Sequence, residues 1–271
     1  MTAAASTVAL RRSARPLPFR LARAELLKVR KRRGLVATAV LLTVAAVVIL
    51  EVAMELFHLS NPVKYSAAGG GDHFRRAMFL LSQLGSVAAA LVGASLGADD
   101  VSAGVFRDLV ATGRSRAALF AARIPGGLAM VWPLTAAAFT IACLFTVGLA
   151  GGKPTPDTTL FVESGLWVEL AVGLAFALGL GLGSVISSRA QTVSILFGWI
   201  VIVEPLLTRV TALAAGREWL LSAGVDRLAP AGILPARDRV PMSLGVAVAV
   251  TVAWALVPLA AGLWRTRTRD A

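Results

Sequence analysis

Carboxylates and amides inside apolar segments are the residues of this 271-residue chain whose types could do chemistry. Glu51 and Glu55 lie four residues apart near the end of one apolar run, so a helix puts both on one face. Gln83 and Glu204 lie inside two further runs, and Glu204 directly precedes Pro205. Polar groups within membrane-spanning helices are costly, and they mark substrate paths or buried pairs. These four residues are candidates for lining a path across a membrane. The alternative is that the acids reach the membrane interface and pair with nearby arginines.

A second group of polar residues lies between the second and third apolar runs, from Asp99 to Arg123. Asp99 and Asp100 suit the positive end of a helix dipole, and Gly113 suits a position just after a helix. Between them, apolar residues recur at helical spacing and form one face: Val105, Phe106, Leu109 and Val110. The pattern predicts a short amphipathic helix that begins near Asp99. On pattern alone, this is a membrane-surface helix joining two spans.

Motifs for nucleotide hydrolysis and metal catalysis are incomplete in this sequence. Lys153 follows two glycines but lacks the upstream glycine and the following Ser or Thr of a phosphate-binding loop. The Asp99-Asp100 pair could begin an aspartate-rich Mg²⁺ motif, but no further acid follows at the required spacing. His58 and His73 lack a metalloprotease context, and we interpret them as incidental. The sequence therefore predicts no catalytic residue, no metal site and no cofactor in this chain.

The elements that must position these residues are membrane helices. The composition is 57% hydrophobic and 15% charged, and each apolar run approaches the roughly 20 residues that cross a bilayer. The sequence predicts an all-α, polytopic membrane protein with six spans, at residues 35–57, 77–98, 125–150, 165–186, 192–208 and 242–264. The fifth is short, and a tilted or re-entrant continuation past Arg209 is one interpretation. Cys143 is the single cysteine, which excludes an internal disulfide.

The basic residues predict orientation and a lipid partner. If the N-terminus is cytoplasmic, the inner side carries about twice as many Lys and Arg residues as the outer side. This places both termini and the 99–123 segment inside the cell. The net charge of +12 beside apolar spans favours anionic lipid over nucleic acid as a partner. From Phe19 to Arg33, apolar and basic residues alternate as in an amphipathic interfacial helix, and a disordered basic tail is the alternative.

The 99–123 segment resembles the first cytoplasmic loop of type-2 ABC export permeases, the membrane subunits of bacterial ABC exporters. Residues that match the pattern of that loop are Asp100, Gly104, Leu109, Ser115, Arg116 and Arg123. Val105 stands where that family has Thr, and Gly113 stands where Pro is usual. Glu25 and Lys28 are also similar to a Glu-x-x-Lys pattern ahead of the first span. With the six-span layout, the resemblance covers nearly the whole chain.

The resemblance implies a permease subunit of the bacterial inner membrane that is not itself an enzyme. ATP and Mg²⁺ would be bound by a separate ATP-binding subunit, and a second copy of the permease or a paralogue would complete the path. The loop would be the coupling helix, contacting the ATPase through Asp99, Asp100, Gly104, Val105, Phe106, Arg107, Leu109 and Arg116. The first, second and fifth spans would line the path.

The expected organisation has three parts: a basic tail and interfacial helix (1–34), the six-span domain (35–264) and a cytoplasmic tail (265–271). Two other functions stay open from the sequence. One is a membrane-embedded lipid transferase, and the other is a scaffold subunit with no transport role. The transported substrate is not predicted.

Overall fold

The computed structural model describes residues 17–111, 113–234 and 240–269. Every regular element in these ranges is helical. Among these described residues, six helices are long and apolar enough to cross a membrane, as predicted, which fits a multi-pass membrane protein. The candidate spans are Arg33–Ser60, Gly71–Ser102, Arg116–Gly148, Thr158–Ile186, Arg189–Arg209 and Leu244–Thr268.

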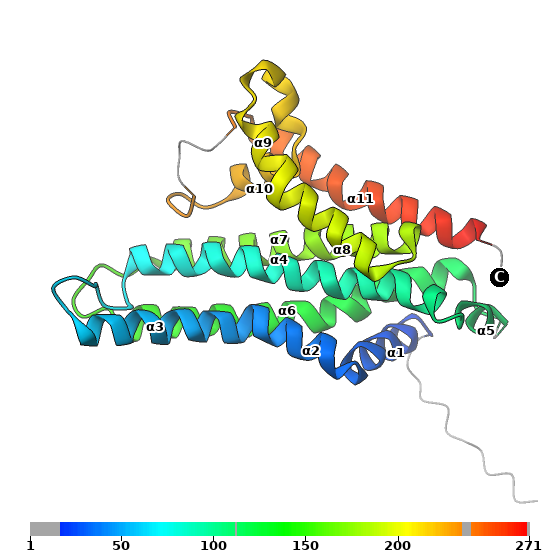
Figure 1. Cartoon of the computed structure of the whole chain (residues 1–271), viewed down its shortest axis with the longest axis horizontal. Coiled ribbons are helices and arrows are strands. Elements are labelled where there is room, and N and C mark those ends of the chain that lie inside the picture. Colours follow the sequence, from blue (N-terminus) through cyan, green and yellow to red (C-terminus); the bar gives the residue numbers. More distant parts are fainter. Residues whose placement is uncertain (1–16, 112, 235–239, 270–271) are drawn as a thin grey trace, which may run out of the picture.

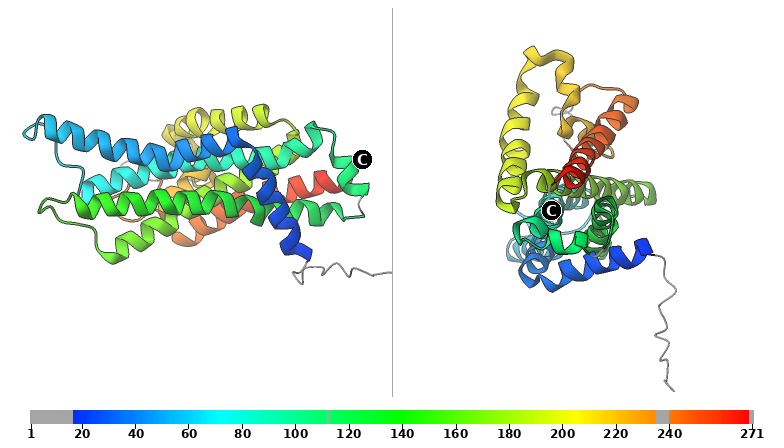
Figure 2. Two further views of the ribbon diagram at one scale, coloured as in Figure 1. Left: turned by 90° about the horizontal axis from the view of Figure 1, so that it is seen from below. Right: turned by 90° about the vertical axis from the view of Figure 1, so that its right-hand side faces the viewer.

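The N-terminal half begins with α1 (Leu17–Lys31), which is separated from the first span by a break at Arg32. That span consists of α2 (Arg33–Val40), the π-helical segment η1 (Leu41–Ala45) and α3 (Ala46–Ser60). The next elements are α4 (Gly71–Ser102), the short α5 (Phe106–Ala111) and α6 (Arg116–Gly148). In Figure 1, α3, α4 and α6 run along the length of the molecule, and α1 lies obliquely at one end of them (Figure 2).

The C-terminal half contains α7 (Thr158–Ile186), then the fifth span, built from α8 (Arg189–Phe197), the π-helical η2 (Gly198–Val203) and α9 (Glu204–Arg209). Pro205 gives a physical reason for the π-helical turns before it, because proline lacks an N–H and its ring clashes with the preceding turn. The helix ends at Arg209 and does not continue as a re-entrant span. A 3₁₀ segment, η3 (Thr211–Trp219), and α10 (Leu221–Leu228) lead to α11 (Leu244–Thr268).

Glycines set the centre of the bundle, where α4 and α7 make the most extensive contact. A Cβ on Gly93 would lie 2.3 Å from the Phe176 carbonyl oxygen, and one on Gly179 would lie 2.4 Å from that of Ala90. Small residues therefore let these two helices approach each other closely. Gly181 lies against Pro258 of α11, so alternate glycines of α7 contact two different helices.

The helices differ in how much of their surface the chain itself covers. In its most apolar window, α7 has 67% of its residues buried, whereas the fifth span has 18%. The fifth span leans away from the bundle in Figure 1 and exposes Ile195, Phe197, Ile202 and Leu206. An apolar surface of this kind fits lipid or another apolar helix.

Candidate functional site

The two aspartates that open the predicted loop helix lie in the last turn of α4. The expectation that they begin a separate helix was wrong, because α4 continues through Ser102 and α5 begins only at Phe106. At this position, carboxylates face the negative end of the α4 dipole, which is unfavourable without nearby cations. The chain supplies those cations from two other helices.

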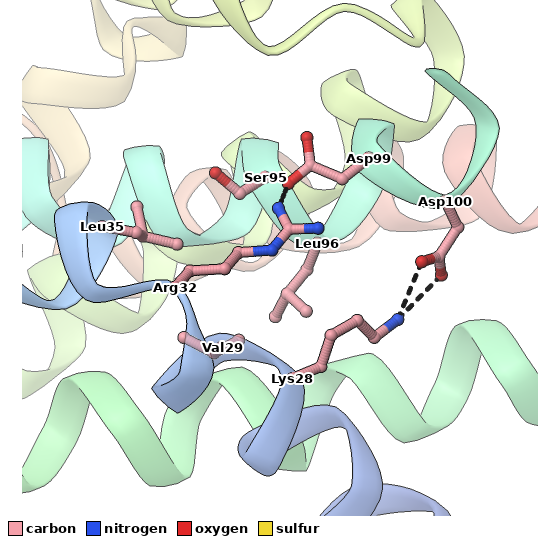
Figure 3. A pocket seen from close by; sticks show the side chains of 8 residues that line it. All are labelled: Lys28, Val29, Arg32, Leu35, Ser95, Leu96, Asp99 and Asp100. Carbon is pink, nitrogen blue, oxygen red and sulfur yellow. Dashed lines mark hydrogen bonds and ion pairs between the residues drawn. The ribbon is translucent and has the colours of Figure 1, made fainter. Parts of the chain in front are cut away.

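Asp100 is the centre of this network and is 4% exposed. Lys28 Nζ of α1 donates to both of its carboxylate oxygens at 2.9 Å, and Arg123 Nη2 of α6 donates to Oδ2 at 2.8 Å. Arg32 pairs with Asp99, and Lys28 also lies 2.8 Å from Glu25 Oε2. Figure 3 shows Lys28 reaching Asp100 and Arg32 reaching Asp99 across the gap between α1 and α4.

Packing closes this network to ligands. The space beside Lys28, Arg32 and Asp99 measures only about 10 Å³, which is about the volume that one water molecule needs. The α1 backbone also approaches α6 closely, because a Cβ on Gly126 would lie 2.9 Å from the Ala22 carbonyl oxygen. The cluster therefore fixes α1, α4 and α6 to one another and is not a binding site for a substrate.

The short helix α5 lies in the connection that this network encloses. Gly104 and Gly113 flank it with φ values of +72° and +77°, which favour glycine. Within α5, Phe106 is 4% exposed and Leu109 is half-buried, whereas Arg107 is exposed. Val105, just before the helix, is 41% exposed. The residue before Gly113 lies outside the described ranges.

The start of α6 is bound to the C-terminal end of the chain. Ser115 accepts a hydrogen bond from Ala118 N and caps α6. Arg116 Nη1 donates to the Arg267 carbonyl at 3.0 Å and also to the Arg269 carbonyl. The Arg269 side chain donates from Nη2 to Ser187 Oγ. Ser187 ends α7 in the left-handed conformation. The start of α6 is thus joined to the ends of α7 and α11.

At the other end of α4, a cavity of about 990 Å³ lies between α4, the fifth span and the η3–α10 segment. It brings together Gln83 and Glu204, two of the four acid and amide candidates. Arginines line the same cavity: Arg75, Arg76, Arg209 and Arg217. Lining apolar side chains include Phe79, Ile200, Ile233, Leu234 and Val240.

Glu204 lines this cavity, but its carboxylate oxygens accept hydrogen bonds from other groups of the chain. It is 1% exposed, and its Oε1 accepts from Leu221 N at 2.8 Å and from Trp199 Nε1 at 3.2 Å. Ser222 N donates to Oε2 at 3.2 Å. The carboxylate thus caps the N-terminus of α10, which has no cap of its own from Leu220. This contact fixes the η3–α10 segment on the end of the fifth span.

Glu51 and Glu55 do not line this cavity. Glu51 is completely buried, and its Oε2 lies 2.5 Å from Nε2 of His73, a residue that is 5% exposed in the first turn of α4. Glu55 Oε2 accepts from Ala68 N at 3.2 Å. The sequence analysis interpreted His73 only as an incidental residue and not as a ligand, and the structure adds that it is the buried partner of Glu51. The signal that could have found it is that a buried acid in an apolar helix needs a partner.

The chemistry of these two regions is that of charge pairing and hydrogen bonding. Within the described residues, no three His, Cys, Asp or Glu side chains are grouped to hold a metal ion. Comparison with known protein families and with characterised proteins gave no match.

Proposed function

We propose that this chain is the permease subunit of an ATP-binding cassette exporter, forming the translocation path in a bacterial inner membrane. Two permease copies would work with two separate ATPase subunits, which bind ATP and Mg²⁺. Both termini and α5 would be cytoplasmic. No bond would be made or broken by this chain.

The observation that carries the proposal is the position and attachment of α5. It connects the second and third candidate spans and lies at the same end as α1 and the end of α11 (Figure 1). Asp100 and Arg123, on either side of this connection, are joined at 2.8 Å. Because this ion pair joins the two ends of the connection, a push on α5 would reach both spans, as a subunit driven by a separate ATPase requires.

The contact surface of the proposed coupling helix is narrower than the eight residues that the sequence suggests. Phe106 and Asp100 are each 4% exposed, so they support the connection from inside the chain. Val105 and Arg107 are exposed and are the residues that a partner groove would cover. Apolar anchors near the centre of an interface contribute most of the binding energy.

The path would run beside the cavity between the second and fifth spans. Gln83 and Glu204 both line it, which supports two of the four candidates. Glu51 and Glu55 belong to the packing of α3 on the following segment, so we assign them no contact with substrate. The weakly covered fifth span supplies an apolar surface for the second permease copy.

α1 is proposed to lie on the cytoplasmic leaflet. Its basic side chains Arg20, Arg23, Arg30 and Lys31 are exposed, while Val29 and Glu25 are buried against the bundle. Exposed cations on one side of such a helix attract anionic headgroups, each by about 1 kcal/mol.

The test is purification of the tagged full chain from its native membranes, followed by identification of any ATP-binding cassette protein that co-purifies with it. We expect a stable complex with wild type and about tenfold less ATPase bound to Val105→Asp, because a carboxylate would be buried in the interface. Val63→Asp is the matched control, since Val63 is fully exposed at the opposite end. Absence of a wild-type complex with an ATP-binding cassette protein would contradict the proposal.

A further inference from the structure

We propose that the cavity of about 990 Å³ lined by Gln83 and Glu204 binds the anionic head group of an amphiphilic substrate. The head group would lie between Arg76 of α4 and Arg209 of α9. This inference rests on the proposed function, because it names the substrate class of the same path. Three observations support it: the arginines of the cavity wall, the absence of a described partner for Arg76 and Arg209, and the mixture of polar and apolar side chains.

The acids of the cavity wall are largely committed within the chain. Asp72 lies 3.0 Å from Arg75 Nη1, and Glu204 accepts from the backbone of α10. Asp226, the third acid of this wall, also has an interaction partner. Four arginines line the same wall, so cationic charge exceeds the acid that is available to neutralise it.

Arg76 and Arg209 have guanidinium groups with capacity for a ligand. Neither makes a hydrogen bond or an ion pair with any residue that the structure describes. Both are exposed and line the cavity from different helices. Arg217 differs, since it donates to the carbonyls of Ala214 and Thr208 at 3.4 Å. Guanidinium groups bind phosphate or carboxylate through two parallel hydrogen bonds.

A second cavity of about 330 Å³ shares this charged edge. Asp72, Arg75 and Arg76 line both cavities, and Lys153 lines the second. Lys153 donates to the Ala67 carbonyl at 2.9 Å, which leaves its positive charge without an acid. Arg76 therefore lies where two basic cavities meet.

Size and apolar lining indicate an amphiphile rather than a small free anion. Ligand sites have volumes of roughly 300 to 1,000 Å³ and are mostly apolar with a few fixed polar groups. The larger cavity, about 990 Å³, is at the upper end of that range. Phe79 and Ile200 line it beside the arginines, so a head group and part of an acyl chain find matching surfaces.

The test uses the purified full chain in phosphatidylcholine nanodiscs and radiolabelled dodecyl phosphate as the probe. We expect dodecyl phosphate to bind at least about tenfold more tightly than dodecyl trimethylammonium. The double variant Arg76→Gln/Arg209→Gln should lose about tenfold or more in affinity for dodecyl phosphate, because charge-assisted hydrogen bonds are lost. The matched control Lys64→Gln/Arg189→Gln removes two exposed charges that do not line either cavity, and it should bind as wild type does.

Three results would overturn the inference. Equal binding of the two probes would remove the charge selectivity. Wild-type affinity for dodecyl phosphate in both the Gln pair and the pair Arg76→Lys/Arg209→Lys would show that the two arginines do not bind the probe. The Lys pair keeps both positive charges, so it is the control for misfolding of the Gln pair. Displacement by inorganic phosphate as effective as that by unlabelled dodecyl phosphate would identify a free oxyanion, not an amphiphile.

This binding measurement needs no ATPase, so its outcome is independent of the co-purification test. If the chain binds the anionic probe selectively but has no ATPase partner, only the proposed function is contradicted. If it has an ATPase partner but binds the two probes equally, only the proposed substrate class is contradicted.

Discussion

Buried charges in this chain lie at points where helices meet. Asp100 joins α4 to α1 and α6, and Glu51 of α3 meets His73 of α4. Removing a charge from water costs several kcal/mol per ion, and a close partner offsets that cost. Breaking one member of such a pair is therefore far more damaging than replacing both. The pairs fix which helices are neighbours, which apolar side chains alone do weakly inside a lipid bilayer.

The Glu51–His73 pair gives the prediction at this scale. His73→Ala should lower the free energy of unfolding by about 3 kcal/mol or more, because the buried Glu51 carboxyl group loses its partner. The double variant Glu51→Gln/His73→Ala should recover much of that loss, since the unpartnered carboxyl group is replaced by a neutral amide. Thermal unfolding in detergent measures both. A double variant as unstable as the sum of its two single variants would contradict the coupling.

Residue pairings of this kind could not be predicted from the sequence, because their members lie far apart along it. His73 follows Glu51 by 22 residues across a loop, and Lys28 precedes Asp100 by 72. Hydropathy treats each charge as the end of a span, whichever partner it has. The sequence therefore indicated which residues were costly to bury, and the fold supplied their partners.

Among the elements, α4 and α7 form the rigid centre, and the fifth span is the helix that the chain covers least. The apolar runs of the sequence predicted the six long helices well, since the length of a run carries that signal. A predicted span was too short where charges at its ends are paired: the second span was placed at 77–98, and α4 is Gly71–Ser102. Asp99 and Asp100 extend α4 because Lys28, Arg32 and Arg123 neutralise them.

A single added methyl group tests the glycine contact between these two helices. Gly93→Ala should destabilise the protein by about 1–3 kcal/mol, because its Cβ would lie 2.3 Å from the Phe176 backbone oxygen and must push the helices apart. Gly245→Ala is the matched control, since nothing lies within 4 Å of a Cβ there. Equal melting temperatures for the two variants would show that the close approach is absent.

Across the whole molecule, α4 joins the two candidate regions. Its last turn holds Asp100, and its N-terminal half carries Arg76 and Gln83 to the cavity between α4 and the fifth span. A helix of 32 residues rises about 48 Å, which is enough to connect the two sides of a membrane. In the proposed function, a push on α5 at one end would reach the cavity at the other through this single helix. The sequence predicted the membrane span but not that one helix serves both regions.

The most direct test of this account is site-specific crosslinking from Val105→Cys. The background replaces the single cysteine, Cys143, with Ser, and Val63→Cys serves as the fully exposed control at the other end. With the chain in native membranes, a short bifunctional thiol-to-amine reagent should join Val105→Cys to an ATP-binding cassette subunit and leave Val63→Cys unjoined. A crosslink to that subunit from Val63→Cys, or none from Val105→Cys, would contradict the central claim that α5 is the coupling helix.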